Sequence, residues 1–182
     1  GDAGIFVQTG GQHTIDDGDL VLGNSAGATG SYTLGGGTLN ATRNETIGNG
    51  GTGAFSQTAG SHSVGQTLTI GVGSSYTLSN SGILTVGAQE EINGTFTQNG
   101  GSNFANNPNN LQQFGFNVSG TYHLSGGTLN SESVEAIADG GQFFQTAGTH
   151  TVGSAGEHVF LAIVGVNEGT GGTGGAYTLS SS

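Results

Sequence analysis

The chain has 182 residues, of which 39 are Gly, one is Pro and none is Cys, Met or Trp. Arg43 is the only Lys or Arg against 12 acidic residues, so the formal net charge at pH 7 is −11. Nucleic-acid binding requires several Lys or Arg residues to neutralise phosphates, so a chain with one Arg and 12 acidic residues is excluded from that class. The same excess of negative charge excludes attraction to anionic lipid. No apolar run approaches the about 18 residues of a membrane-spanning helix, so we expect no membrane insertion.

The first predicted strands lie in "FVQTGGQHTI" at residues 6–15, where alternating side chains flank a Gly pair. Alternation places one set of side chains inside and the other in solvent, and Gly supplies the positive φ that a corner needs. A third short strand follows as "LVLG" at 20–23. Residues 6–23 therefore predict three short strands joined by corners.

The rest of the chain repeats this unit in two alternating versions. The Phe version returns as "FSQTAGSHSV" from Phe55, "FTQNGGSNFA" from Phe96 and "FFQTAGTHTV" from Phe143. The Tyr version appears between them as "YTLGGGTLN" from Tyr32, "YTLSNSGILTV" from Tyr76, "YHLSGGTLN" from Tyr122 and "YTLSSS" from Tyr177. The stretch "SESVEAIADGG" aligns with "ATRNETIGNGG", whose "ETIG" matches the third strand, and is predicted to be a strand rather than a helix.

This self-similarity predicts an all-β fold, namely a single parallel β-solenoid (β-helix) of about eight three-stranded rungs of roughly 22 residues. We expect one continuous repeat array over residues 1–182. An irregular rung with an insertion is expected near 103–117, which contains the only Pro. The array is expected to be a segment of a longer array or a filament subunit.

The first position of every unit is aromatic. In parallel rungs ~4.8 Å apart, each inward side chain lies on its equivalent in the next rung. We therefore expect a structural ladder of stacked rings that holds the rungs together. Its members are Phe6, Tyr32, Phe55, Tyr76, Phe96, Tyr122, Phe143 and Tyr177.

Three histidines, His13, His62 and His150, occupy one column of the repeat, with Asn103 in the remaining Phe unit. Equivalent histidines are two rungs apart, or ~9.6 Å, which is too far for two of them to bind one zinc ion. We interpret them as hydrogen-bonded structural residues that alternate with Leu.

Glu45, Glu90 and Glu135 form another column, with successive members 45 residues apart. Carboxylates ~9.6 Å apart approach the separation used by glycosidases, but a pair that recurs throughout the repeat favours architecture. We expect each Glu to accept backbone N–H groups at a corner. No catalytic or cofactor-binding residue is predicted, and the chain is expected not to be an enzyme.

The acidic stretch "IDDGDL" places Asp16, Asp17 and Asp19 within four residues. These carboxylates are weak candidates for Ca²⁺ binding, since hard cations prefer several oxygen ligands. Their spacing matches neither an EF-hand nor the nonapeptide of calcium-binding β-rolls. A solvated turn without metal is the favoured interpretation, so no cofactor is expected, with Ca²⁺ as the alternative.

Outward Thr residues, such as Thr33, Thr77 and Thr178, resemble the flat faces of ice-binding solenoids. Other residue types interrupt this row, so ice binding is a minor alternative. The interrupting residues are Val7, Ser56, His123 and Phe144.

The phrases "GxFxQTGGxHTV" and "GxYxLSGGTLN" resemble the Gly-rich repeats of secreted bacterial surface proteins, such as autotransporter-passenger-like adhesins. The resemblance covers nearly the whole chain and implies export, adhesion, matrix formation or fibre assembly, and no cofactor. We therefore expect an extracellular or cell-surface protein with a structural or adhesive role. The expected partners are other copies, which join through the solenoid ends into head-to-tail filaments, and surface glycans. The alternative is a carbohydrate-binding or carbohydrate-cleaving β-helix.

Overall fold

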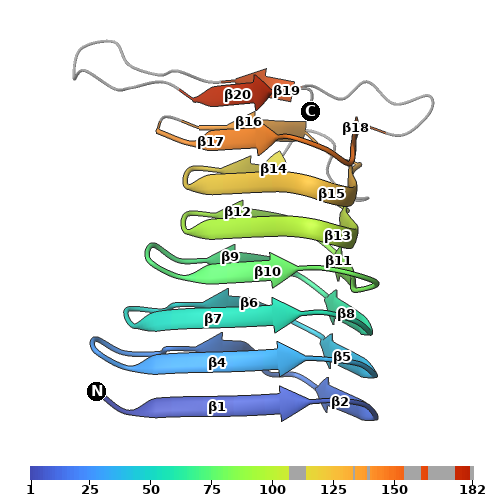
Figure 1. Cartoon of the computed structure of the whole chain (residues 1–182). Coiled ribbons are helices and arrows are strands. Elements are labelled where there is room, and N and C mark those ends of the chain that lie inside the picture. The colour runs from blue at the N-terminus through green and yellow to red at the C-terminus, as the bar shows by residue number, and fades with distance from the viewer. Residues whose placement is uncertain (107–113, 133, 139, 154–160, 164–174, 181–182) are drawn as a thin grey trace.

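The computed structural model describes residues 1–106, 114–132, 134–138, 140–153, 161–163 and 175–180. All regular elements within these ranges are β-strands. Figure 1 shows the strands stacked turn upon turn along one axis, with the N-terminus at one end of the stack. Neighbouring strands pair in parallel on each side of the stack. The fold is an all-β parallel β-solenoid, which confirms the predicted class.

Each turn has three sides. The first side stacks β1 (Ala3–Gln8), β4 (Thr29–Leu34), β7 (Thr52–Gln57), β10 (Ser75–Leu78), β13 (Thr95–Ala105), β15 (Thr121–Ser131), β17 (Gln142–Gln145) and β20 (Ala176–Leu179). The second side stacks β2 (Gln12–Ile15), β5 (Thr38–Ala41), β8 (Ser61–Val64), β11 (Ile83–Val86), the ends of β13 and β15, and β18 (Thr149–Val152). The third side stacks β3 (Leu20–Leu22), β6 (Glu45–Ile47), β9 (Thr67–Ile70), β12 (Gln89–Ile92), β14 (Phe114–Val118), β16 (Val134–Ile137) and β19 (Leu161–Ile163).

We number the turns one to eight by their aromatic residue, so that odd turns carry Phe and even turns carry Tyr. The register aligns these residues without a slip along the first side, for example Phe6 with Tyr32 and Tyr32 with Phe55. Because side chains alternate along each strand, one set fills the interior and the other faces outward. In β7, for example, Phe55 and Gln57 are buried and Ser56 between them is only half-buried.

Two details differ from the sequence-based expectation. The first two sides of turns five and six form single 11-residue strands, β13 and β15, because these strands remain paired through the corner. The described residues include strands on all three sides for turns one to seven but only β20 for turn eight. The number of complete turns is therefore smaller than the eight predicted.

The two irregular stretches of the sequence have different outcomes. Residues 134–137 form β16, so the predicted strand there is confirmed. The insertion expected near 103–117 falls largely on residues 107–113, which lie outside the described residues. The flanking strands still pair in register with turn four, through Asn103 in β13 and Phe116 in β14.

The corner between the first two sides requires glycine for two reasons. Gly11 and Gly37 occupy equivalent corners in turns one and two, with φ values of 71° and 80°. L side chains rarely adopt this region, whereas Gly does so freely. A Cβ atom on Gly37 would also lie 2.2 Å from the carbonyl oxygen of Gly11. The Gly pair of the repeat therefore lets successive corners stack directly on one another.

Candidate functional site

The interior contains a continuous stack of aromatic rings. From Phe6 to Tyr177, the centroids of successive rings are 4.7–5.0 Å apart. The planes of Tyr32 and Phe55 differ by only 2°. Phe116 in β14 adds an edge-on contact to Tyr122, with centroids 5.4 Å apart. The ring contacts thus follow the ladder expected from the sequence.

The two kinds of turn carry complementary polar groups in the interior. Odd turns place Gln and His, or Asn in turn five, on the first two sides, where even turns place Leu. Even turns instead supply a Tyr hydroxyl and, on the third side, a Glu where odd turns place an apolar residue. Turns three and seven therefore present their Gln and His between a Glu of the preceding turn and a Tyr of the following one.

One complete network spans turns two to four. Glu45 Oε2 lies 2.7 Å from His62 Nε2, and both side chains are fully buried. The other ring nitrogen, Nδ1, lies 3.0 Å from the Tyr76 hydroxyl. That hydroxyl donates to Gln57 Oε1 at 2.6 Å. The Gln57 amide nitrogen donates to the carbonyl oxygens of Gly60 and Ile83, which closes the network at the corner.

The backbone carbonyls at one end of this network determine the direction of every hydrogen bond in it. Backbone carbonyls only accept, so the Gln57 amide must turn its nitrogen toward them and its oxygen toward Tyr76. Tyr76 then donates to Gln57 and accepts a hydrogen bond from His62 Nδ1–H. The other ring nitrogen, Nε2, is left to face the Glu45 carboxyl group.

The same arrangement returns in the last three turns. His150 Nε2 lies 2.8 Å from Glu135 Oε1, and His150 Nδ1 lies 3.1 Å from the Tyr177 hydroxyl. Tyr177 donates to Gln145 Oε1 at 2.8 Å. In the first turn, His13 Nδ1 keeps the contact to Tyr32 at 3.0 Å. No described carboxylate is paired with the other nitrogen of His13.

Turn five departs from this pattern because Asn103 replaces His. Its amide nitrogen lies 3.1 Å from both carboxyl oxygens of Glu90 and 3.4 Å from the Tyr122 hydroxyl. Burial raises the pKa of Glu90 to about 8, the Asn103 hydrogen bond lowers it in part, and the charge of Glu135 raises it further. Glu90 is therefore a buried carboxyl group without a cationic partner.

The tyrosine hydroxyls are shielded by the same interior. Burial, and then the nearby Glu45 carboxylate, raise the pKa of Tyr32 to about 12. Burial raises the pKa of Tyr76 and Tyr122 well above the ordinary value, and nearby Glu90 contributes to both shifts. The hydroxyls are thus held as proton donors within the network.

Sequence reasoning misplaced the glutamates. They do not accept backbone N–H groups at corners, since the partners of Glu45, Glu90 and Glu135 are His62, Asn103 and His150. The three carboxylates have no exposed surface, so a polysaccharide outside the rod cannot reach them. The physical reason is that the third side points its Glu residues inward, toward the polar groups of the second side. The signal that was missed is the shared alternation of Glu, His, Tyr and Gln.

The aspartates of the acidic stretch lie on the outside. Asp16 and Asp17 are exposed, and Asp17 has a positive φ of 56°. Asp19 lies 3.8 Å from Arg43 and accepts the backbone N–H of Asn44. Nowhere in the described part of the chain do three or more His, Cys, Asp or Glu side chains lie in a group that could hold a metal ion.

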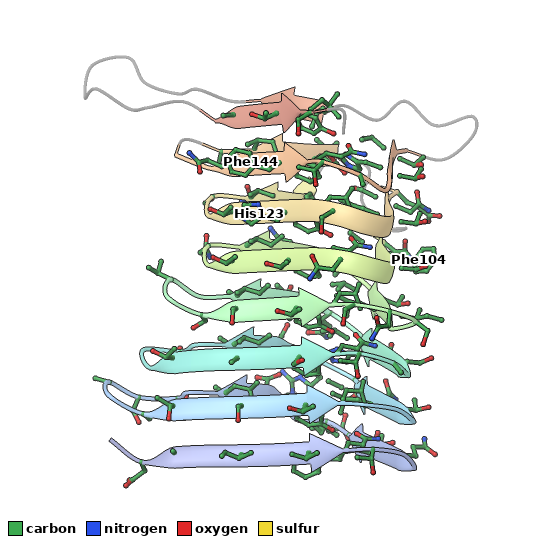
Figure 2. The ribbon with its side chains drawn as sticks, viewed as in Figure 1. Phe104, His123 and Phe144 are labelled. Carbon is green, nitrogen blue, oxygen red and sulfur yellow. The ribbon has the colours of Figure 1, made fainter. Side chains whose placement is uncertain are left out.

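Three ring side chains stand out on the otherwise small and polar exterior. His123 and Phe144 lie on the outer first side of turns six and seven, and Phe104 projects at the second side of turn five (Figure 2). The rings of His123 and Phe144 stack with centroids 5.1 Å apart and an angle of 14°. They replace the hydroxyl side chain found at Thr97 in turn five, so the Thr row is interrupted here.

A cleft lies at the open side of the first turns. Its volume is about 510 Å³, and residues 2–6, 21–24 and 28–31 line it. Phe6 at its border is 47% exposed, whereas Phe55 two turns further is 1% exposed. The exposure of Phe6 results from the lack of a described turn on its outer face.

The chain matches no family model, and neither a curated protein nor a solved structure shows significant similarity to it. Among the described residues, no helix has the length and apolar character needed to cross a bilayer. What the fold and interior define is a parallel β-solenoid whose buried groups hold successive turns together.

Proposed function

We propose that this chain is a structural or adhesive rod of an extracellular or cell-surface protein. The observation that carries the proposal is the filled interior, in which the rings of the ladder and the three inward Glu residues contact side chains of the next turn. Glu45, Glu90 and Glu135 are fully buried. Side chains used in this way stabilise a long shape rather than act on a substrate. The resemblance to Gly-rich repeats of secreted surface proteins supports the extracellular setting.

The rod is proposed to associate end to end. On the first described turn, Phe6 is 47% exposed at the end of the ring stack, and the outward-facing Ile5 and Val7 beside it are 78% and 61% exposed. Free strand edges with apolar side chains favour pairing with another chain. Contact between turns of different copies would continue both the hydrogen-bond ladder and the ring stack.

Negative-stain microscopy and sedimentation over a range of concentrations test this association. We expect rods that lengthen with concentration, and a Phe6→Ser variant that shortens them. Val72→Ser is the matched control, because Val72 is 83% exposed but lies at a corner between turns. Short particles of one size at every concentration, or equal effects of both variants, would contradict end-to-end association.

Carbohydrate binding is the second candidate function. The stacked pair of exposed His123 and half-buried Phe144 supports it, because outward rings offer an apolar platform beside the polar groups of the exterior. A glycan array with the wild-type chain, His123→Ser and Phe144→Ser tests it, with Thr97→Ser as the control. Release of reducing sugar by the wild-type chain, abolished by Glu90→Gln, would instead favour an enzyme and contradict the structural role.

A further inference from the structure

The buried carboxylates of the even turns differ in the side chain that each one faces. Glu45 and Glu135 each face a histidine ring nitrogen, at 2.7 and 2.8 Å. Glu90 faces Asn103, which donates a hydrogen bond but has no ionisable group. The same column position therefore holds two Glu–His pairs and one carboxyl group that faces an amide.

Among the described residues, no cation lies near Glu90. The neighbouring turns on its own side place Leu68 and Phe116 beside it. The titratable groups that influence it or are influenced by it are Tyr76, Tyr122 and Glu135. All three are neutral or negative, so none offsets a negative charge on Glu90.

Of the three histidines of the column, His13 lies in turn one, and the two nearer Glu90 are already engaged. His62 contacts Glu45 and His150 contacts Glu135. Arg43, the only Lys or Arg of the chain, lies at the surface with about half of its side chain exposed, beside Asp19. A charge on Glu90 would therefore be buried without compensation, which is strongly unfavourable.

The Asn103 amide suits both states of the carboxyl group. Its nitrogen faces the carboxylate, while its buried oxygen, Oδ1, has no hydrogen-bond partner. Rotation of the amide by half a turn would let Oδ1 accept the O–H of protonated Glu90. Histidine at this position has no such second orientation.

Turn five, which contains Asn103, also pairs irregularly with turn six. Strands β13 and β15 shift register at Asn99, and β14 and β16 shift between Phe114 and Phe116. These shifts lie one junction beyond the contact between Glu90 and Asn103, so turn five is held less regularly on that side than the other described turns.

We propose that Glu90 and Asn103 form a pH-sensitive joint, which holds turn five closely while Glu90 is protonated and loosens it when Glu90 ionises. The effect is local, because the buried carboxyl groups on either side, Glu45 and Glu135, each face a histidine, whereas Glu90 faces an amide. The rod would then remain folded while its middle becomes more accessible.

The pKa of Glu90 sets the direction of the pH dependence and the pH range in which it occurs. It is raised from 4.5 to about 8, so the folded state holds a proton that the open state releases. The resulting stability is fully present below pH 4.5 and is lost as pH rises through about 8. Between these values the opening equilibrium should increase by up to about tenfold per pH unit.

Hydrogen exchange of the full chain, read as protection factors by mass spectrometry from about pH 5 to about pH 9, tests the joint. We expect protection around Glu90 and Asn103 to fall with pH up to about 8 and then to level off, and to fall more steeply than in strand β4, which contains no carboxylate. Equal slopes in both regions, or no slope near Glu90, would overturn the proposal, even if every variant failed to fold.

Variants test whether the pH dependence of protection is due to Glu90. Glu90→Gln should abolish the slope, since the isosteric amide cannot ionise. Glu91→Gln is the matched control, because Glu91 is the next residue of β12 but points outward, so the slope should remain. A slope that persists in Glu90→Gln, or disappears in Glu91→Gln, would contradict the assignment to Glu90.

Discussion

Glu45 of turn two lies 2.7 Å from His62 of turn three, with both side chains completely buried. This contact explains why the chain alternates two versions of one repeat. A solenoid of identical turns would stack His on His and Glu on Glu, which places like groups together in a medium of low polarity. Alternation separates them by Leu layers and brings each His between a Glu and a Tyr.

Exchange of the two aromatic types should destabilise the chain in both directions. Tyr76→Phe removes the hydroxyl that joins Gln57 to His62 and should cost about 1–3 kcal/mol. Phe55→Tyr adds a hydroxyl among the Leu residues of neighbouring turns and should cost a similar amount. Urea unfolding measures both values. A neutral Phe55→Tyr change would show that the turns are interchangeable and contradict the alternation.

Loss of one ring should depend on its place in the ladder. Phe96→Ala removes a fully buried ring between Tyr76 and Tyr122 and should cost about 3–5 kcal/mol. Phe6→Ala is the control, because Phe6 has only one ladder neighbour and is 47% exposed, so its cost should be clearly smaller. Thermal and urea unfolding measure both. Equal costs would mean that stacking between turns contributes little.

The features that repeat along the rod axis were predictable from the sequence. Parallel turns bring equivalent residues together, so the positions of Phe6, Tyr32 and Phe55 in one line follow from the period alone. The corner glycines follow in the same way, because Gly11 and Gly37 recur at a fixed distance after the aromatic residue.

The contacts across the interior were not predictable in this way. Periodicity identifies the Glu column and the His column, but not that the third side faces the second. Glu45 and His62 also belong to different turns, so alignment of the repeats never places them together. The shared alternation of Glu, His, Tyr and Gln was present in the sequence, but its meaning depends on which columns meet inside the turn.

An added turn should stabilise the first turn. A copy of residues 28–49 placed before Gly1 preserves the spacing, because Ala3 aligns with Thr29 and Thr29 with Thr52. It would cover Phe6 and bring the copied Glu45 to His13, so Tm should rise. The same addition carrying Glu45→Leu in the copy should give a smaller rise, because one nitrogen of His13 then stays unpaired. An unchanged Tm in the first fusion would contradict the expectation that an added turn packs on turn one as the existing turns pack on each other.

Alkaline titration of the four Tyr hydroxyls should show that they are buried in the ladder. The chain has four Tyr and no Trp, and all four Tyr belong to the ladder. Their raised pKa values mean that this contribution to stability is fully present below pH 10 and is lost as pH rises, for Tyr32 through about 12. Tyrosinate absorbance should therefore rise together with loss of the β-sheet circular dichroism signal. Ionisation near pH 10 with the sheet intact would contradict the burial of these hydroxyls.

A double-mutant cycle on Glu45 and His62 tests most directly whether complementary buried groups hold successive turns together. Each single change, Glu45→Leu or His62→Leu, leaves one buried polar partner unpaired and should cost about 3–5 kcal/mol. The double change places Leu at both positions, and we expect it to be more stable than the sum of the two costs predicts, by more than about 2 kcal/mol. Costs that add within about 0.5 kcal/mol would contradict the account.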